Sequence, residues 1–384
     1  MANIELGKVC DVRDGTHDSP KSVSEGYPLV TSKNIVDGLI DISNVNFISE
    51  EDYKAINKRS NVDHGDILMP MIGTIGGTVI VNKEFEFAIK NVALIKFHKD
   101  SKVTAKYIKY VLDSNLFLRY VESENRGNTQ KFLSLGKIRS FPIPLISIEM
   151  QSGITSILDN LSQTIKKRKE QIELLDVLIK SRFVELFGDP VLNPKGWNMG
   201  CLGDVCDVRD GTHDSPNYVA EGYPLVTSKN VSNGYIDFSS VNLISEEDLN
   251  AINKRSKVDN GDIIMPMIGT VGNPIIVSTE KIFAIKNVAL IKFKEESLVN
   301  NVYIKAVLES DYFENAVSMN KRGGTQKFIS LGDIRKFSIQ VPMLEYQNEF
   351  MIFVKQVDKL KVEVQKSLDE SQLLFDSLMQ KYFE

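Results

Sequence analysis

The side chains most able to do chemistry gather in one short string. Asp14, His17 and Asp18 lie within RDGTHDSP, and carboxylates beside an imidazole could bind a metal ion or transfer protons. Three such residues followed by proline are more typical of a hydrogen-bonded polar turn. The chain has only 4 histidines, and none has a second histidine or a cysteine at ligand spacing. We therefore expect neither a catalytic centre nor a metal site here.

The sequence also lacks the common cofactor motifs. There is no GxxxxGK[ST] phosphate loop, and no aromatic N/D-P-P-Y/F string of the kind found in methyltransferases. Gly73, Gly76 and Gly77 miss the GxGxxG spacing, and Asn273 stands where the second copy would repeat Gly77. These glycines are typical of turns or of close backbone approaches. We expect no cofactor bound by this chain itself.

The chain is one unit written twice, at a constant offset of 196 residues. CDVRDGTHDSP, EGYPLVTSKN and FAIKNVALIKF each occur unchanged in both copies. Along this register 93 of the 146 positions from 6 to 151 are identical, but only 3 of the 36 from 152 to 187. Repetition at a fixed period marks a repeated structural unit, and the sudden loss of identity marks its end.

The elements that must position these residues change type at the same point. Before it, short β-rich runs such as GDILMPMIG and FAIKNVALIKF mix with helical segments at 50–59 and 105–121, which predicts an α+β domain. After it, apolar residues alternate in steps of four and three, as in a coiled-coil seam. The seam positions are Ile154, Leu158, Leu161, Ile165, Arg168, Ile172, Leu175, Ile179, Arg182 and Leu186, then Phe350, Val354, Val357, Lys361, Val364, Leu368, Ser371, Phe375, Leu378 and Tyr382.

The resulting organisation is domain, rod, domain, rod. Each seam is too long to be covered by its own domain, so each helix is the natural partner of the other. The connector FGDPVLNPKGW carries two prolines and two glycines, which stop the first helix. We predict a first domain at 1–148, a long helix at 149–187, a linker at 188–201, a second domain at 202–344 and a second long helix at 345–384.

Composition limits the class of protein further. The 384 residues are 42% apolar and 25% charged, with no run of 18 apolar residues and no basic–apolar leader at the start. Three cysteines cannot build a disulfide framework. We expect a cytoplasmic protein with no membrane partner. A net charge of −5 excludes a uniformly basic coat, but leaves room for a basic face.

Cationic and amide side chains recur in both copies while their neighbours vary. The strings ENRGNTQKF and NKRGGTQKF each lie in a segment with five Lys or Arg. Lysine and arginine neutralise phosphate, and Arg, Asn and Gln can bond bases bidentately. A flexible basic loop of this composition suits DNA, although for any single lysine a solvated surface position is the more common finding.

Taken together, these strings resemble the specificity subunit of Type I restriction-modification systems. The resemblance covers nearly the whole chain and includes DGTHDSP, EGYPLVTSKN, MIGTIG, GxTQKFxSLGxIRxF, a Glu-x-Gln helix start and FGDPVxNPKGW. The PIP string before that start becomes Ser338, Ile339 and Gln340 in the second copy. The family implies two target-recognition domains related by a pseudo-two-fold axis, and two long helices that form an antiparallel coiled coil.

The resemblance also implies a function and partners. Each domain would read half of a split double-stranded DNA target, and near-identical domains predict a near-palindrome. Two modification (methyltransferase) subunits would bring S-adenosylmethionine, and restriction subunits would bring ATP with Mg²⁺. The residues expected to contact DNA are Arg13, Thr16, His17, Lys33, Asn34, Thr74, Lys90, Arg126, Thr129, Gln130 and Lys131, with Arg209, Thr212, His213, Lys229, Asn230, Thr270, Lys286, Arg322, Thr325, Gln326 and Lys327 in the second copy.

Two alternatives remain open from the sequence. The chain could be a DNA-acting enzyme with a catalytic motif that we do not recognise. It could also be a coiled-coil scaffold that binds only protein, although that would leave unexplained why the shared identity lies in the globular parts. We expect a non-catalytic subunit, and assays of methylation and ATPase activity would separate the three.

Overall fold

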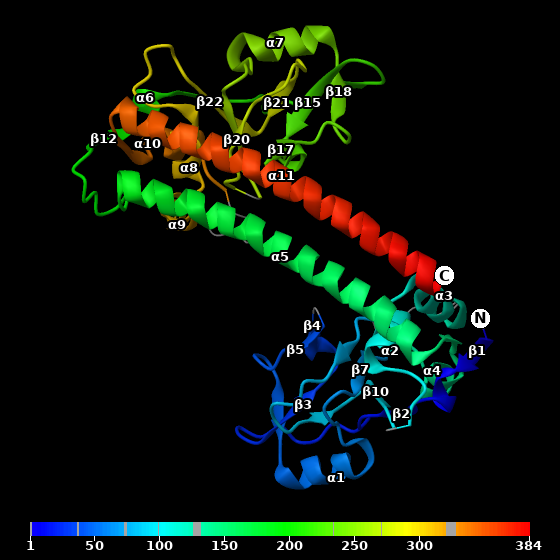
Figure 1. The fold of residues 1–384 in the computed structure, drawn as a ribbon. Helices are drawn as coiled ribbons and strands as arrows, with labels where there is room; N and C mark the ends of the chain where they lie inside the picture. The colour runs from blue at the N-terminus through cyan, green and yellow to red at the C-terminus, as the bar shows by residue number, and fades with distance from the viewer. Residues whose placement is uncertain are drawn as a thin grey trace. The chain divides into compact units, whose positions relative to one another are not determined.

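The computed structural model describes residues 2–36, 38–72, 75–98, 100–125, 132–232, 234–269, 271–319 and 328–384. It divides into two units. One comprises Met1–Lys169 with Lys366–Glu384, and the other Glu170–Gln365. Each unit therefore combines one copy of the repeat with part of both long helices (Figure 1).

An antiparallel sheet lies at the centre of the first unit, in the order β2 (Asp11–Asp14), β10 (Val92–Lys96), β7 (Ile67–Pro70) and β8 (Val79–Ile80). Ile67 and Met69 point into one apolar core and Leu68 into another. Side chains alternate between the faces of a strand, so a run that is apolar throughout belongs to a sheet covered on both faces. The β-rich runs in the sequence are confirmed as strands.

A second, smaller sheet precedes Lys33 and Lys90, two of the residues predicted to contact DNA. Its order is β6 (Asn46–Ile48), β3 (Tyr27–Val30) and β9 (Ala88–Ile89), with β3 and β9 parallel. The short 3₁₀ helix Ser32–Asn34 and the hairpin of β4 (Ile35–Val36) and β5 (Leu39–Ile40) follow β3. The first strand, β1 (Ala2–Glu5), leads into the 3₁₀ helix Leu6–Lys8 and pairs with β11 (Pro142–Leu145).

The helices of this domain are α1 (Glu50–Ser60), α2 (Ala105–Leu112), α3 (Asn115–Glu124) and α4 (Leu135–Ser140). The segment 105–121, helix-like in sequence, is two helices and not one. At the break the Ser114 hydroxyl donates to the carbonyl of Val111 at 2.6 Å, and Asp113 accepts from Thr78 at 2.8 Å. Short polar side chains compete in this way with the helical hydrogen bonds.

The second unit repeats this topology. Its strands form three small sheets and one hairpin, and its helices follow in the same order. The strands are β13 (Asp207–Asp210), β22 (Val288–Lys292), β19 (Ile263–Pro266) and β20 (Ile275–Ile276); β14 (Tyr218–Val219), β18 (Asn242–Ile244), β15 (Tyr223–Thr227) and β21 (Ala284–Lys286); β16 (Val231–Ser232) with β17 (Tyr235–Ile236); and β12 (Asn198–Cys201) with β23 (Ser338–Val341). The helices are α6 (Leu202–Val205), the 3₁₀ helix Ser228–Asn230, α7 (Glu246–Ser256), α8 (Asn301–Leu308), α9 (Asp311–Met319) and α10 (Leu331–Lys336).

One strand lies where the sequence predicts only a connection. Residues 198–201, placed in the linker, form β12, which pairs with β23 along four residues. The strand is the counterpart of β1, so the second domain begins before the region of shared identity does. A pairing between residues about 140 positions apart has no local sequence signal.

Each long helix has 40 residues: α5 (Ile148–Phe187) and α11 (Leu344–Phe383). At 1.5 Å per residue each is about 60 Å long. All twenty seam positions are buried or half-buried, as predicted. Gly188 ends α5 with φ +79°, and its N–H donates to the carbonyl of Val184 at 2.8 Å, an arrangement typical of a glycine after a helix C-terminus.

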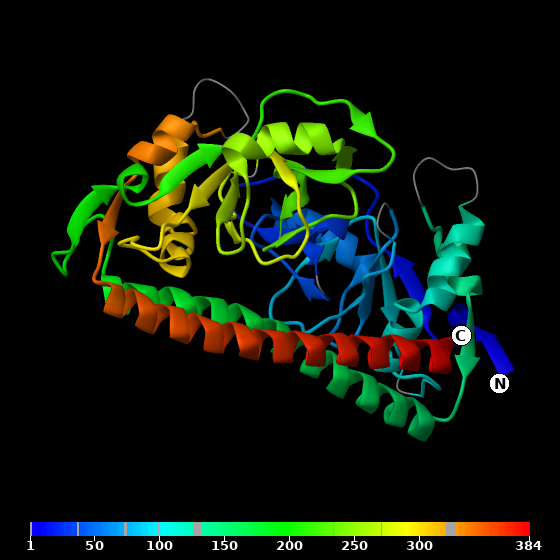
Figure 2. The ribbon, with the colours of Figure 1, turned by 90° about the horizontal axis from the view of Figure 1, so that it is seen from above.

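Within each unit the two long helices run antiparallel, as both views of the ribbon show (Figure 2). In the first unit Arg168 donates to the Ser371 hydroxyl and to the carbonyl of Ser367. In the second unit Lys361 pairs with Asp176 at 2.6 Å, and further along α5 Arg182 pairs with Glu349, which lies earlier in α11. Each polar side chain of the seam thus has a partner on the other helix. Paired polar residues in the seam fix the register of a coiled coil.

A buried glutamine fastens each long helix to its domain. Gln151 is fully buried; its side chain accepts from the backbone N–H of Thr104 at 2.9 Å and donates to the carbonyls of Lys102 and Ile146. Gln347 makes the same three bonds in the second unit. This accounts for the recurrence of Gln at the helix start in both copies.

Candidate nucleic-acid interface

A buried carboxylate joins three segments at the end of β2. Asp14 is only 4% exposed and forms an ion pair with Arg59 at the end of α1. Its other oxygen, Oδ2, lies 2.8 Å from Nε2 of His17. The second ring nitrogen of His17, Nδ1, lies 2.8 Å from Oδ1 of Asn91. The string RDGTHDSP is therefore a bonded polar turn, as its composition indicates, and it is held in place by residues far along the chain.

The second unit builds the same network. Arg255 pairs with Asp210 at 2.7 Å, and Nε2 of His213 lies 2.8 Å from Oδ2 of that carboxylate. Nδ1 of His213 lies 2.7 Å from Oδ1 of Asn287. We call these two sets, Asp14, His17, Arg59 and Asn91 and their counterparts Asp210, His213, Arg255 and Asn287, the histidine networks.

The networks favour protonated histidine. In each, the hydrogen bond to the asparagine oxygen, and after it the bond to the aspartate, raise the pKa of His17 and His213 above 6.5. Both bonds need an N–H donor on the ring, and only the imidazolium has two. The side chains of His17 and His213 are 58% and 64% exposed, so the positive edge is open to a ligand.

Close backbone contact requires the glycine of this turn. A Cβ atom at Gly15 would lie 2.1 Å from the carbonyl oxygen of Ile89, and one at Gly211 would lie 2.2 Å from that of Ile285. The facing turn contains Asn91 in the first unit and Asn287 in the second. Their φ angles are +53° and +54°, in the left-handed region that asparagine tolerates. The geometry of each histidine network therefore depends on a glycine and an asparagine in facing turns.

Two lysines in each copy lie beside the network. Lys90 follows β9, donates through Nζ to Ser19, and donates through its N–H to the carbonyl of Val30 at 2.9 Å. Lys33 lies three residues after Val30 and is exposed. Since β3 and β9 are parallel, both lysines follow strands that end at the same edge. Lys286 and Lys229 occupy the same positions in the second unit.

Asn34 and Asn230 lie inside their turns. Asn34 is 6% exposed; its Oδ1 accepts from Thr31, and its Nδ2 donates to the carbonyls of Asp41 and Asn44. Asn230 is 4% exposed and accepts from Thr227 in the same way. We assign both amides a structural role, and Lys33 and Lys229 are the exposed members of the string TSKN.

The remaining described candidates are engaged within the domain. Arg13 pairs with Asp11 at 2.6 Å and donates to the carbonyl of Arg59, and Arg209 makes the corresponding bonds. The Thr16 and Thr212 hydroxyls accept from backbone N–H groups two residues further on. The arginines are half-buried and lie beside the histidine networks, so they remain candidates for contact at the network edge.

Ten of the predicted contact residues lie outside the described residues. They are Thr74, Arg126, Thr129, Gln130 and Lys131, with Thr270, Arg322, Thr325, Gln326 and Lys327 in the second copy. Their contact with DNA stays a prediction from the sequence.

The histidine networks also contain residues that are not among the contacts predicted from the sequence. Arg59 pairs with Asp14 and Arg255 with Asp210, and the two arginine side chains are 67% and 63% exposed. Their identity in both copies was the available signal, but the pairing spans 45 residues and cannot be derived from spacing. Arg139 of α4 also supports the network through a long-range contact. Its side chain donates two hydrogen bonds to the carbonyl of Val12, at 3.2 and 2.6 Å, and so holds β2 in place.

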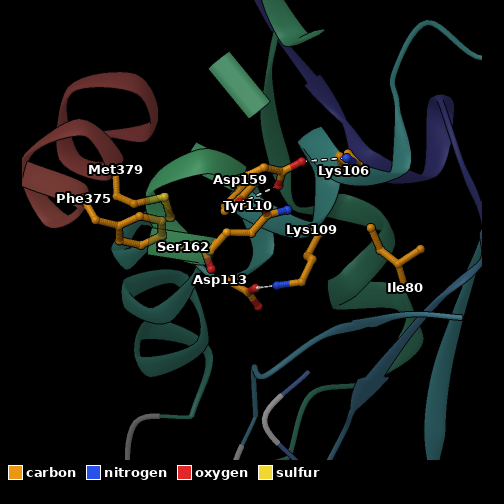
Figure 3. A pocket seen from close by; sticks show the side chains of 10 residues that line it. Ile80, Lys106, Lys109, Tyr110, Asp113, Asp159, Ser162, Phe375 and Met379 are labelled. Atoms are coloured by element: carbon orange, nitrogen blue, oxygen red, sulfur yellow. Dashed lines mark hydrogen bonds and ion pairs between the residues drawn. The ribbon is translucent and has the colours of Figure 1, made fainter. Parts of the chain in front are cut away.

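A groove of about 500 Å³ lies apart from this network, where α2 meets both long helices of the first unit (Figure 3). Asp159 of α5 accepts from Tyr110 at 2.8 Å and from Lys106 at 2.6 Å, while Phe375 and Met379 of α11 line the apolar side. Burial and the neighbouring carboxylate raise the pKa of Tyr110. The second copy has Ala306 and Lys355 at the positions of Tyr110 and Asp159, so the polar lining of this groove is not repeated.

The arrangement around each network suits an anion. The aspartate of each network, Asp14 or Asp210, pairs with an arginine and a histidine. The exposed edges of the histidine, arginine and lysine side chains remain for a ligand such as phosphate. Among the described residues, no group of three His, Cys, Asp or Glu side chains could hold a metal ion. Within the same part of the chain, no helix is long and apolar enough to cross a membrane.

Comparison with known proteins identifies the family of the chain. The profile of the "Type I restriction modification DNA specificity domain" matches residues 1–174 and again 194–371. The MjaX specificity subunit of a type I restriction enzyme from Methanocaldococcus jannaschii is 25% identical over 385 residues, covering 95% of this chain and 88% of that protein. The EcoBI specificity subunit from Escherichia coli is 20% identical, covering 83% and 73%.

Solved structures share the fold. The S subunit of the Type I restriction-modification system of M. genitalium superposes with a TM-score of 0.60 at 14% identity, over 100% of this chain and 96% of that one. The repeated family match places the chain in a class of DNA specificity proteins with two such domains. The chain belongs to the Type I restriction-modification DNA specificity family. Its function is target recognition, and the family implies DNA and the methyltransferase and restriction subunits as its partners.

Proposed function

We propose that each unit contacts one half of a split double-stranded DNA target through its histidine network and the adjacent lysines. The observation that carries this is the repetition of the network in both units. The two His–Asp distances are both 2.8 Å, and the His–Asn distances are 2.8 and 2.7 Å. The two units share the same hydrogen bonds at this surface while neighbouring loops differ in sequence. This supports a function that both copies perform.

The network would position the DNA and not read it. Protonated His17, with Arg59 and Lys90, would neutralise backbone phosphates, which supply affinity and register without sequence information. Base reading would then fall to segments that differ between the copies. This division of labour fits the structure, because the network residues are identical in both units whereas an exposed residue such as Leu39 corresponds to Tyr235 in the second copy.

The target would be a near-palindrome interrupted by unspecified bases. With 93 of 146 residues identical, the domains should prefer nearly the same bases. Because α5 and α11 run antiparallel within each unit, we infer that the half-sites are inverted copies, as for dimeric readers of half-sites.

The near-palindrome can be tested by making the two copies identical. A chain in which residues 202–347 are replaced by the sequence of 6–151 should direct methylation to a fully inverted target, because both domains would then read the same letters. Mapping the modified adenines with the original and the altered chain gives the comparison. Two unrelated half-sites in the original chain would contradict the near-palindrome.

The chemistry would belong to the partners. We propose that two modification subunits bring S-adenosylmethionine and the adenine methyltransferase site, that a restriction subunit brings ATP and Mg²⁺, and that this chain binds no cofactor and catalyses no step. The complex would act in the cytoplasm, where its DNA lies. The purified chain alone should show neither methylation nor ATPase activity, and adding the modification subunit should restore methylation only. Activity of the isolated chain would overturn this assignment.

A further inference from the structure

The hairpin β4–β5 exposes apolar side chains beside a lysine. Among the described residues of the first domain, 2–147, five large apolar side chains are exposed, and three of them, Val36 at 47%, Leu39 at 66% and Ile42 at 41%, belong to this hairpin and the turn after it. Single exposed apolar residues are normal, but a cluster on one element marks a contact surface.

The hairpin is firmly held at its base. Ile35 and Ile40, paired across the two strands, pack on the core beneath the sheet. The carbonyl of Asn34 accepts from the N–H of Asp41 at 2.7 Å, and the buried Asn34 amide donates to the carbonyl of Asp41. The outward pair Val36 and Leu39 therefore stands on a rigid support, which a group that must meet a ligand at a fixed position requires.

The two copies agree at the base of the hairpin and differ at its tip. Thr31, Lys33, Asn34 and Asp41 have identical counterparts, whereas Leu39 corresponds to Tyr235. Tyr235 is 56% exposed on β17 and lies opposite Ser232, as Leu39 lies opposite Val36. A shared support with a variable exposed tip is the arrangement expected of an element that reads different bases in two half-sites.

We propose that these hairpins enter the DNA and that Leu39 and Tyr235 contact bases, with Lys33 and Lys229 held by phosphates beside them. This rests on the proposed function, since it assigns the reading element within each half-site. An apolar side chain can contact a thymine methyl group or wedge at a base step, and tyrosine adds a hydroxyl that can bond a base edge. The half-sites should therefore differ at the position that residues 39 and 235 contact.

The test is selection from a pool of duplexes with randomised half-sites, using the full chain assembled with its modification subunits. Leu39→Tyr should change the preferred base at one position of one half-site toward that of the other. Leu39→Asp should weaken binding about tenfold, because a buried contact to a base is worth roughly this much. Lys33→Ala should weaken all sequences equally and lower the salt slope by about one.

The controls separate the possible failures. Leu192→Tyr alters a linker leucine that is 78% exposed and should leave selection unchanged, and thermal unfolding of each variant reports its folding. Unchanged base preference and affinity in both Leu39 variants would overturn the role of the hairpin while leaving the proposed function intact. If the unaltered complex selects no sequence, the proposed function and the hairpin's role both fail.

Discussion

Nε2 of His17 lies 2.8 Å from Oδ2 of Asp14, a carboxylate that also pairs with Arg59. The imidazolium is thus stabilised by a buried anion while its own edge stays exposed. Because Asn91 and Asp14 raise the pKa of His17, the network gains positive charge at a higher pH than a free histidine would.

DNA affinity should therefore depend on pH. Because the pKa of His17 is raised in the folded chain, the protonated histidine stabilises the fold fully below about pH 6.5. That stabilisation is lost as the pH rises through the raised pKa. The attraction between the protonated histidine and phosphate follows the same pH dependence. We expect binding to weaken several-fold between pH 6 and pH 8, and the double variant His17→Gln, His213→Gln to lose most of this dependence. Fluorescence anisotropy across that range measures both.

The control for this prediction is another histidine. His64 is exposed and stands outside the network, so His64→Gln should keep the pH profile of the unaltered chain. An equal pH dependence in the double variant would show that other groups titrate and that the network histidines do not face phosphate.

Gly15 is needed because the neighbouring backbone leaves no room for a side chain, and not because of its own φ angle. Gly15→Ala would place a Cβ atom 2.1 Å from the carbonyl oxygen of Ile89, so β2 and the turn before Asn91 must separate. We expect a loss of about 1–3 kcal/mol in the free energy of unfolding, as for other overpacked sites, together with weaker DNA binding. Denaturant unfolding measures the first and anisotropy the second.

Gly153 is the matched control. It lies within α5, and the space that a methyl group would occupy there is open. Gly153→Ala should therefore stabilise the chain by about 0.5–1 kcal/mol, because alanine loses less conformational entropy in a helix. Equal effects of the two substitutions would contradict the close approach at Gly15.

The parts of the fold set by periodicity could be predicted from the sequence. The seam positions of α5 and α11 follow a seven-residue pattern, and a seam of that length must be covered. At the break between Leu112 and Asn115, Asp113 and Ser114 are short polar residues that compete with helical hydrogen bonds, but the bond from Thr78 to Asp113, more than thirty residues away, has no local signal. The pattern of apolar residues is local information, whereas the partner of a polar side chain is not.

The same limit applies to the site. The repetition of RDGTHDSP, Lys33 and Lys90 indicated which segments matter, but Arg59 became part of the network only through its pairing with Asp14. Asn34 was predicted to contact DNA because amides can bond bases, and the structure gives that amide four bonds inside its own turn. Residue type identifies what a side chain can do, and burial decides where it does it.

Gln151 should be needed to hold α5 on its domain. Gln151→Ala would leave the N–H of Thr104 and the carbonyls of Lys102 and Ile146 without their partner, and a buried polar group left unsatisfied costs about 1–3 kcal/mol. We expect a loss of at least that size in chemical unfolding. Ser152→Ala, an exposed neighbour on the same helix turn, should change stability by less than about 0.5 kcal/mol.

The long helices should set the length of the unspecified spacer in the target. Their polar seam positions, such as Arg168 against Ser371 and Lys361 against Asp176, tie the register, and a seven-residue insertion keeps the seam in phase. Inserting one heptad after Lys169 and one after Gln365 lengthens each helix by roughly 10 Å, which equals about three base pairs of DNA. Methylated-adenine mapping should then find a spacer about three base pairs longer. Insertion of three residues at the same points breaks the seam and should abolish modification, whereas an unchanged spacer with the heptad variant would rule out the helices as its determinant.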